Sequence, residues 1–248
     1  VELETVKQVY QENFGAGAMH LAIVGDLDTA EARAQLEQRF GAWKSRQAFV
    51  RVPLPLVPSK PEAVLLRTPD KQMAMVGMGL ALAMRDDDPD LAALDLATHA
   101  LGRGFNSRLI ARLRTKEGIS YGAFAGLQSE GLDPVSLLMT GAMAANPNAR
   151  RAATILREEL LRWVEKGLTQ VELDEFKRNY REGFRKELGD DEFLTQLLDS
   201  TIFEKKTLAY YGELQQKVQA LTLEKVNETL RRRIDPKLLV EVIAGDVP

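Results

Sequence analysis

The sequence predicts an α+β fold in which an antiparallel sheet is layered with helices. Strand-like segments cluster between residues 63 and 144, and long helical patterns occupy most of the chain from 148 to 233. This segregation of strands and helices favours an α+β layer over alternating βαβ units. With 248 residues, of which 45% are hydrophobic, the chain is long enough to bury a sizeable core.

The first elements belong to a repeat, because the two ends of the chain match each other. Shifted by 220 positions, residues 3–26 align without a gap with residues 223–246, and both copies read as an amphipathic helix, a turn and an apolar strand ending in Gly-Asp. The identical positions of the first copy are Leu3, Glu4, Val6, Ile23, Gly25 and Asp26. This shared pattern indicates a long internal repeat. We therefore expect residues 1–49 to be the tail of a preceding homologous repeat, in a fragment or the second half of a longer protein.

A helix and a proline-rich segment come next. Residues 29–42 have helical spacing, and Gly41 is a plausible end of this helix. The densest run of prolines in the chain lies just beyond, at Pro53, Pro55, Pro58 and Pro61. Proline removes backbone donors and favours extended structure, so residues 50–61 are predicted to be a linker. Residues 62–248 then form a second domain.

The first half of this domain is predicted to supply most of the sheet. Four of its segments have the apolar pattern of strands and are separated by turn-forming residues. These segments are 63–68, 72–82, 121–127 and 135–144.

Two helices are expected between the second and third strands. Asp88-Pro89-Asp90 offers an N-cap, a proline at the first helical position and an acid in the first turn, which predicts a helix from Pro89 to about Leu101. A shorter helix is predicted from Ser107 to Lys116, stopped by Gly118.

Helices dominate the second half of the domain. Thr169 and Glu172 have the spacing of a capping box at the start of one of them. The predicted helices cover 148–166, 170–188, 191–205, 208–220 and 223–233, and a last strand covers 238–244.

The composition excludes several kinds of function. A net charge of −3 gives no electrostatic argument for a nucleic-acid or membrane partner. The one dense basic cluster, Arg231 to Arg233, ends a predicted helix, where cations favour the helix dipole. The absence of cysteine removes disulfides, thiolate zinc sites and cysteine nucleophiles, and is compatible with either bacterial periplasm or cytoplasm. No apolar run reaches the length of a membrane span.

Neither histidine predicts a metal site. His20 and His99 are the only two, and neither belongs to a pair at i, i+4 spacing. Serine hydrolysis is disfavoured because no Gly-x-Ser-x-Gly elbow is present. The glycines of Gly102-Arg103-Gly104 could approach a phosphate, but they lack a following Gly-Lys-Ser/Thr, and a turn between two helices suits the pattern better.

Arg114 and Tyr121 are the candidate functional residues. Arg114 would lie in the last turns of the short helix, and Tyr121 would start the strand beyond the Gly118 turn. A turn of this kind can bring a guanidinium and a phenol to the same edge of a sheet. Peptide hydrolysis by a metal-bound water builds negative charge on the scissile carbonyl oxygen, which a tyrosine hydroxyl can stabilise while an arginine holds substrate carbonyls. An isolated pair at this spacing would more often be a surface arginine and a core-edge tyrosine.

The surrounding pattern resembles the insulinase/pitrilysin-type zinc peptidases. In that family a helix ends at a glycine-rich turn, and Ser-Arg-Leu, Leu-Arg-x-Lys-x-Gly and a tyrosine follow at fixed spacing. The chain matches with Leu101-Gly102-Arg103-Gly104, Ser107-Arg108-Leu109, Leu113 to Gly118, and Tyr121. It departs at Arg103, where the family usually has glycine. The family's His-x-x-Glu-His motif is missing.

The resemblance implies a mitochondrial-processing-peptidase-like domain that is the C-terminal, non-metal half of a bacterial zinc endopeptidase. Arg114 and Tyr121 match the pair that reaches across a clamshell to a bound peptide, with Tyr121 as oxyanion donor and Arg114 as substrate clamp. Arg108 matches a position that we interpret as structural. No metal ligand is assigned to this chain, zinc is expected on the homologous partner half, and the chain alone should be inactive. The alternatives are a non-catalytic core or scaffold subunit and a peptide-binding module that uses a sheet edge.

Overall fold

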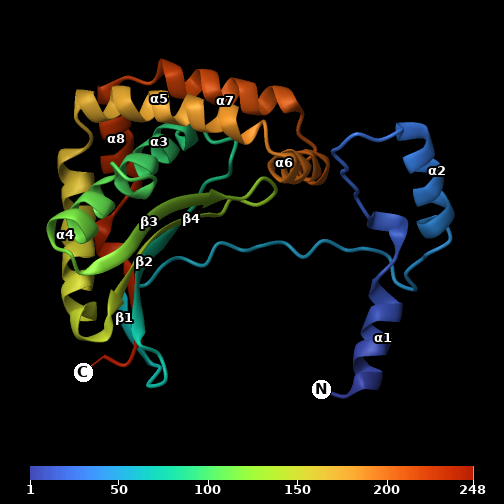
Figure 1. Ribbon diagram of the computed structural model, residues 1–248, viewed down its shortest axis with the longest axis horizontal. Coiled ribbons are helices and arrows are strands. Elements are labelled where there is room, and N and C mark those ends of the chain that lie inside the picture. Colours follow the sequence, from blue (N-terminus) through green and yellow to red (C-terminus); the bar gives the residue numbers. More distant parts are fainter. Residues whose placement is uncertain (248) are drawn as a thin grey trace. The chain divides into compact units, whose positions relative to one another are not determined.

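The computed structural model describes residues 1–247, which divide into two compact units. One unit contains residues 1–53 and 184–210, and the other contains residues 54–183 and 211–247. Figure 1 shows the chain coloured along its length, with most of its helices and strands labelled. None of the helices in the described part is both long and apolar enough to cross a membrane.

The smaller unit is helical. It holds α1 (Leu3–Asn13), a 3₁₀ turn η1 (Ala16–Ala18), α2 (Thr29–Phe40) and α6 (Asp191–Glu204). Asp28 caps α2 by accepting from the backbone N–H groups of Ala30 and Glu31. The strand predicted near Leu21–Leu27 is not formed, because residues 19–27 pair with no other strand in the described chain.

The larger unit is built on a five-stranded sheet (Figure 1). Its spatial order is β1-β5-β2-β4-β3, so β3 is an edge strand and the last strand in sequence lies between the first two. All neighbouring pairs are antiparallel except β1 and β5, which are parallel. The strands are β1 (Glu62–Arg67), β2 (Met73–Leu82), β3 (Ser120–Ser129), β4 (Ser136–Ala145) and β5 (Val240–Gly245).

Helices cover one face of this sheet. α3 (Leu91–Gly102) contacts β3, α4 (Ala149–Lys166) contacts β2, β4 and β5, and α8 (Leu223–Arg233) packs on α3 and α4. α5 (Gln170–Glu187) and α7 (Leu208–Ala220) are each divided between the two units, because residues 184–187 and 208–210 belong to the smaller one.

The core lies between the sheet and these helices. It includes the fully buried side chains of Val76, Leu96, Leu156, Trp163 and Leu230, and each such aliphatic side chain contributes about 1.5–3 kcal/mol of burial free energy. The Trp163 indole N–H donates to the carbonyl of Ala97 at 3.0 Å, so its one polar atom is satisfied.

The opposite face of the sheet is open and apolar. Its outward side chains are at least partly exposed, although alternation would normally place polar residues there. They include Met75, Phe124, Leu137, Met139 and Met143. A hollow of about 480 Å³ lies on this face, and Val57 and Ser59 of the proline-rich segment line part of it.

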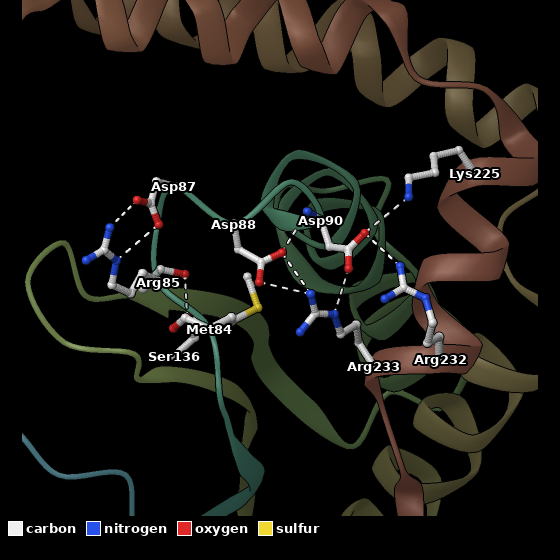
Figure 2. A network of polar contacts seen from close by, with 10 residues as sticks. Met84, Arg85, Asp87, Asp88, Asp90, Ser136, Lys225, Arg232 and Arg233 are labelled. Carbon is white, nitrogen blue, oxygen red and sulfur yellow. Dashed lines mark hydrogen bonds and ion pairs between the residues drawn. The ribbon is translucent and has the colours of Figure 1, made fainter.

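The start of α3 differs from its prediction. The helix begins at Leu91 rather than Pro89, but the side chain of Asp88 still accepts from the Asp90 N–H, which is the hydrogen bond expected of the predicted cap. Both carboxylates bind the end of α8 (Figure 2). Asp90 is only 2% exposed and receives hydrogen bonds from Lys225 (3.2 Å), Arg232 (2.8 Å) and Arg233 (2.7 Å).

Arg233 also binds Asp88, because its Nη2 lies 2.9 Å from both carboxylate oxygens of that residue. We call the cluster of Asp88, Asp90, Lys225, Arg232 and Arg233 the charged corner. Burial by itself raises the pKa of Asp90, but the three bonded cations hold it well below its usual range. The neighbouring loop is fixed as well, because Ser136 Oγ donates to the Met84 carbonyl and Arg85 pairs with Asp87 (Figure 2). The arginines at the end of α8 therefore do more than complement a helix dipole.

Candidate functional site

The site begins where α3 ends against the edge strand. Gly102 is required there, since a Cβ at this position would lie 2.1 Å from the Ala125 backbone nitrogen in β3. The turn that follows is closed by Ser107, whose hydroxyl donates to the Gly104 carbonyl at 2.7 Å. The prediction of a helix–turn–helix connection in place of a phosphate loop is confirmed by this geometry.

The second helix is anchored by Arg108. Its guanidinium donates to both carboxylate oxygens of Glu172 (2.5 and 2.7 Å) and to the Gly167 carbonyl (2.7 Å). Glu172 also accepts from the backbone and hydroxyl of Thr169, so the predicted capping box is present and shares its carboxylate with Arg108. Burial raises the pKa of Glu172, but Arg108 and Thr169 together lower it below its usual value.

Arg114 lies farther along the same helix, in a π-helical stretch named η2 (Ile110–Lys116). Its side chain is exposed and forms no ion pair or hydrogen bond within residues 1–247. The guanidinium carbon instead lies 5.6 Å from the ring centre of Phe105, a side chain that is 80% exposed at the tip of the glycine-rich turn. Arg114 is therefore oriented by an aromatic ring while its five N–H donors remain available.

Tyr121 occupies a β-bulge. The register between β3 and β4 pairs Ser120 with Ala144 and Gly122 with Met143, so Tyr121 is the extra residue. The Ser120 hydroxyl lies 2.7 Å from the carbonyls of both Gly122 and Met143 and stabilises the irregularity. Bulges redirect side chains and are frequent beside active sites. Tyr121 is 77% exposed, and its hydroxyl has no partner in the described chain.

The elements that carry these two residues adjoin. η2 contacts β3, and Gly118, whose φ of +64° is left-handed, reverses the chain between them. An unpaired guanidinium and an unpaired phenol thus project from neighbouring elements at the edge of the sheet. Both are hydrogen-bond donors, so the arrangement suits carbonyl or carboxylate oxygens of an extended ligand.

The histidines lie outside this arrangement. His99, in α3, accepts a hydrogen bond from Arg103 at 2.9 Å and packs against Tyr180, and burial lowers its pKa. His20 lies against the ring of Phe203. Across residues 1–247 no three His, Cys, Asp or Glu side chains converge in a way that could hold a metal ion.

Two features of the site escaped the sequence analysis. Phe105 carries a signal that could have been used, because an aromatic residue in a glycine-rich turn is seldom buried. The bulge at Tyr121 carries none, since it depends on how β3 registers against β4.

Comparison with known proteins gives consistent matches. A family model described as the peptidase M16 inactive domain matches residues 1–180. A Helicobacter pylori protein named non-peptidase homolog YmxG is 22% identical over 239 residues, which cover 93% of this chain and 52% of that protein. The chain thus spans about half the length of this relative.

Solved structures show the same fold. The peptidase M16 inactive domain from Pseudomonas fluorescens matches with a TM-score of 0.81 and 24% identity, over 100% of this chain and 58% of that one. The inactive peptidase domain of a candidate zinc protease from Bordetella parapertussis matches with a TM-score of 0.58 and 21% identity, over 69% of this chain and 91% of that one. The predicted α+β, metallopeptidase-like fold is confirmed.

Proposed function

Because the chain belongs to the family of peptidase M16 inactive domains, we propose that it is the metal-free half of a zinc-dependent endopeptidase. The resemblance to insulinase/pitrilysin-type peptidases found in the sequence agrees with this membership. In this proposal residues 62–248 form the half that holds substrate, residues 50–61 are a linker, and residues 1–49 belong to the preceding repeat.

One observation carries the proposal. Arg108, one helical turn and a half before Arg114, donates to Glu172 and Gly167, whereas Arg114 and Tyr121 are exposed and have no polar partner among residues 1–247. Folding does not use these two donors, so they are available to a ligand.

The chemistry follows from the donors. When water attacks a peptide bond, the carbonyl oxygen gains negative charge, and a hydroxyl placed against it stabilises the transition state more than the ground state. Tyr121 supplies that hydroxyl and keeps its proton. Arg114 binds a neighbouring carbonyl or carboxylate of the peptide through its planar fork, which fixes the register of the substrate.

Zinc does not fit within this half. The described residues hold no cluster of His, Cys, Asp or Glu ligands, so we assign the zinc that the family resemblance implies to the homologous partner half. The chain alone is then expected to be inactive, and no step of hydrolysis is assigned to a metal on it.

The test is reconstitution. The full chain is mixed with the zinc-bearing half of a family member, and cleavage of a fluorogenic peptide is followed. Tyr121→Phe should lower kcat about 10²- to 10³-fold and leave KM nearly unchanged, because it removes a donor that acts on the transition state. Phe124→Tyr, on the same strand and also exposed, is the matched control and should retain the rate. An unchanged rate for Tyr121→Phe in an active mixture would refute the role of Tyr121.

A second candidate is a non-catalytic core or scaffold subunit of the same fold. The name of the Helicobacter pylori relative, a non-peptidase homolog, favours it. In the same experiment this function predicts that the unmodified chain forms a stable complex with the partner half and that no zinc-dependent cleavage appears.

A further inference from the structure

Another hollow, of about 440 Å³, lies in the larger unit where η2, the end of α4 and the start of α5 meet. Neither Arg114 nor Tyr121 lines it, so it is separate from the candidate site. Its walls are unusually rich in positive charge, and we call it the basic hollow. The cations that line it are Arg108, Arg112, Lys116, Arg162 and Lys166.

Two helices present these cations. Arg108, Arg112 and Lys116 are spaced four residues apart along the helix that contains η2, and Arg162 and Lys166 have the same spacing in α4. Residues four apart lie on one side of a helix, so each set faces the hollow together. The stretch from Ile110 to Lys116 is π-helical, a rare form that is frequent at functional sites.

The two carboxylates in the lining are already paired. Glu172 accepts from Arg108 at 2.5 and 2.7 Å, and the buried Glu159 accepts from Arg162 at 2.7 Å. Lys116 and Lys166, by contrast, form no ion pair or hydrogen bond within residues 1–247. The basic hollow therefore keeps two ammonium groups that the fold does not use.

Arg112 is only partly neutralised. Its Nη2 lies 3.2 Å from Glu117, but Glu117 also pairs with Arg151 and so shares its charge between two arginines. Its Nε is buried and has no hydrogen-bond partner in the described chain, since the Oε1 of Glu159 is 4.0 Å away. The charge of Arg112 thus adds to that of the two lysines.

A position at a helix end does not account for both lysines. Lys116 is the last residue of η2 and Lys166 is the last of α4, where the dipole of each helix favours a cation. That effect acts within one helix and does not require two helix ends to share a hollow. Like charges that line the same hollow repel each other, and a bound anion would relieve the repulsion.

We propose that the basic hollow binds the phosphate groups of a small oligophosphate. A phosphate group carries about −1.5 to −2 charges and three acceptor oxygens, so two or three linked groups neutralise Lys116, Lys166 and Arg112 within a compact volume. A carboxylate carries a single charge. The residues that line the hollow include no aromatic side chain, so a nucleoside base has no stacking partner there and recognition rests on the phosphates.

Calorimetric titration of the full chain with tripolyphosphate, at low ionic strength and without divalent metal, tests the proposal. Lys116→Gln/Lys166→Gln should weaken binding about 10- to 100-fold, because each lysine supplies a charge-assisted hydrogen bond. Lys60→Gln/Lys237→Gln changes the net charge equally at exposed positions outside the hollow and should bind like the unmodified chain. Absence of binding, or equal weakening by the two pairs, would overturn the proposal.

Two further ligands test the class. Adenosine triphosphate should bind within about threefold of tripolyphosphate, and tetraglutamate should bind at least about tenfold more weakly. A clear preference for the nucleotide would overturn recognition through phosphates alone. Equal affinity for tetraglutamate would replace the oligophosphate by an acidic peptide. These titrations use no zinc-bearing partner and do not depend on Arg114 or Tyr121, so their failure is distinct from failure of the proposed function.

Discussion

Polar side chains before the start of α3 are bonded within the protein, whereas those beyond its end are exposed and have no polar partner in the described chain. At its start, Asp88 and Asp90 are bonded to Arg232, Arg233 and Lys225, and Asp90 is almost fully buried. Beyond its end, Arg114 and Tyr121 project with no polar partner in the described chain. The densest basic cluster in the sequence is therefore structural, whereas the candidate site contains one arginine, Arg114, together with Tyr121. Unsatisfied donors, rather than density of charge, distinguish the region that can bind a ligand.

The largest effect on stability is expected at the buried end. Asp90→Asn keeps the shape of the side chain but removes the charge that three cations share, and it should lower the free energy of unfolding by about 2–3 kcal/mol. Urea denaturation followed by circular dichroism measures this change. Asp87→Asn, on the same loop but exposed, should move the midpoint little. If the two variants shifted the urea midpoint equally, the buried ion pairs of Asp90 would contribute no more to stability than the exposed pair of Asp87.

Acid should weaken the ion pairs of both Asp90 and Glu172. Three bonded cations hold the pKa of Asp90 below its ordinary value, and Arg108 with Thr169 does the same for Glu172, so the unfolded chain takes up protons first as pH falls. The contribution of these two groups to stability is therefore fully present above about pH 5 and is lost progressively below it. Melting temperatures measured from pH 7 to pH 3 should stay level and then drop, and Asp90→Asn should flatten the drop. A decline that begins near pH 6 would point to other groups.

A smaller effect is expected at Glu172, which connects the helix of the site to α5. Glu172→Gln can still accept from Thr169, but it loses the charge that binds Arg108, and the cost should be about 1–1.5 kcal/mol. Glu175→Gln, which alters only the exposed contact with Asn106, is the control. If both variants unfold at the same urea concentration, Arg108 does not depend on Glu172 for its position.

The smallest effects on stability are expected in the region beyond the end of α3, which carries the candidate site. Tyr121→Phe and Phe105→Leu change exposed side chains and should each alter the free energy of unfolding by no more than about 0.5 kcal/mol. Thermal unfolding of each variant provides the measurement. If Tyr121→Phe lowered the free energy of unfolding by about 2 kcal/mol, the side chain of Tyr121 would be stabilising the fold. The region beyond the end of α3 would then not differ from its start in the way described above.

The sequence was sufficient for elements that depend on local pattern. The boundaries of α5, α7 and α8 follow from helical periodicity, and the cap of α5 follows from Thr169 and Glu172. The family pattern, rather than spacing alone, singled out Arg114 and Tyr121.

Features that depend on distant partners could not be predicted. Asp88 and Asp90 have the local signature of a helix start, but their partners lie more than 130 residues away. Residues 21–27 have the pattern of a strand but pair with no strand in the part of the chain that the structure describes, so the pattern alone predicted the wrong state. The bulge at Tyr121 and the stacking of Phe105 on Arg114 likewise arise only when separate segments meet.

The central position of β5 has a consequence for biosynthesis. β1 and β2 flank a strand that the ribosome makes roughly 10–30 s after β2 itself, at 5–20 residues per second. Until then the nascent chain carries two unpaired strand edges facing an empty position. A chaperone that shields this gap during translation should therefore raise the fraction of chains that reach the native state. A chain that stops before Val240 lacks β5 and should not reach it.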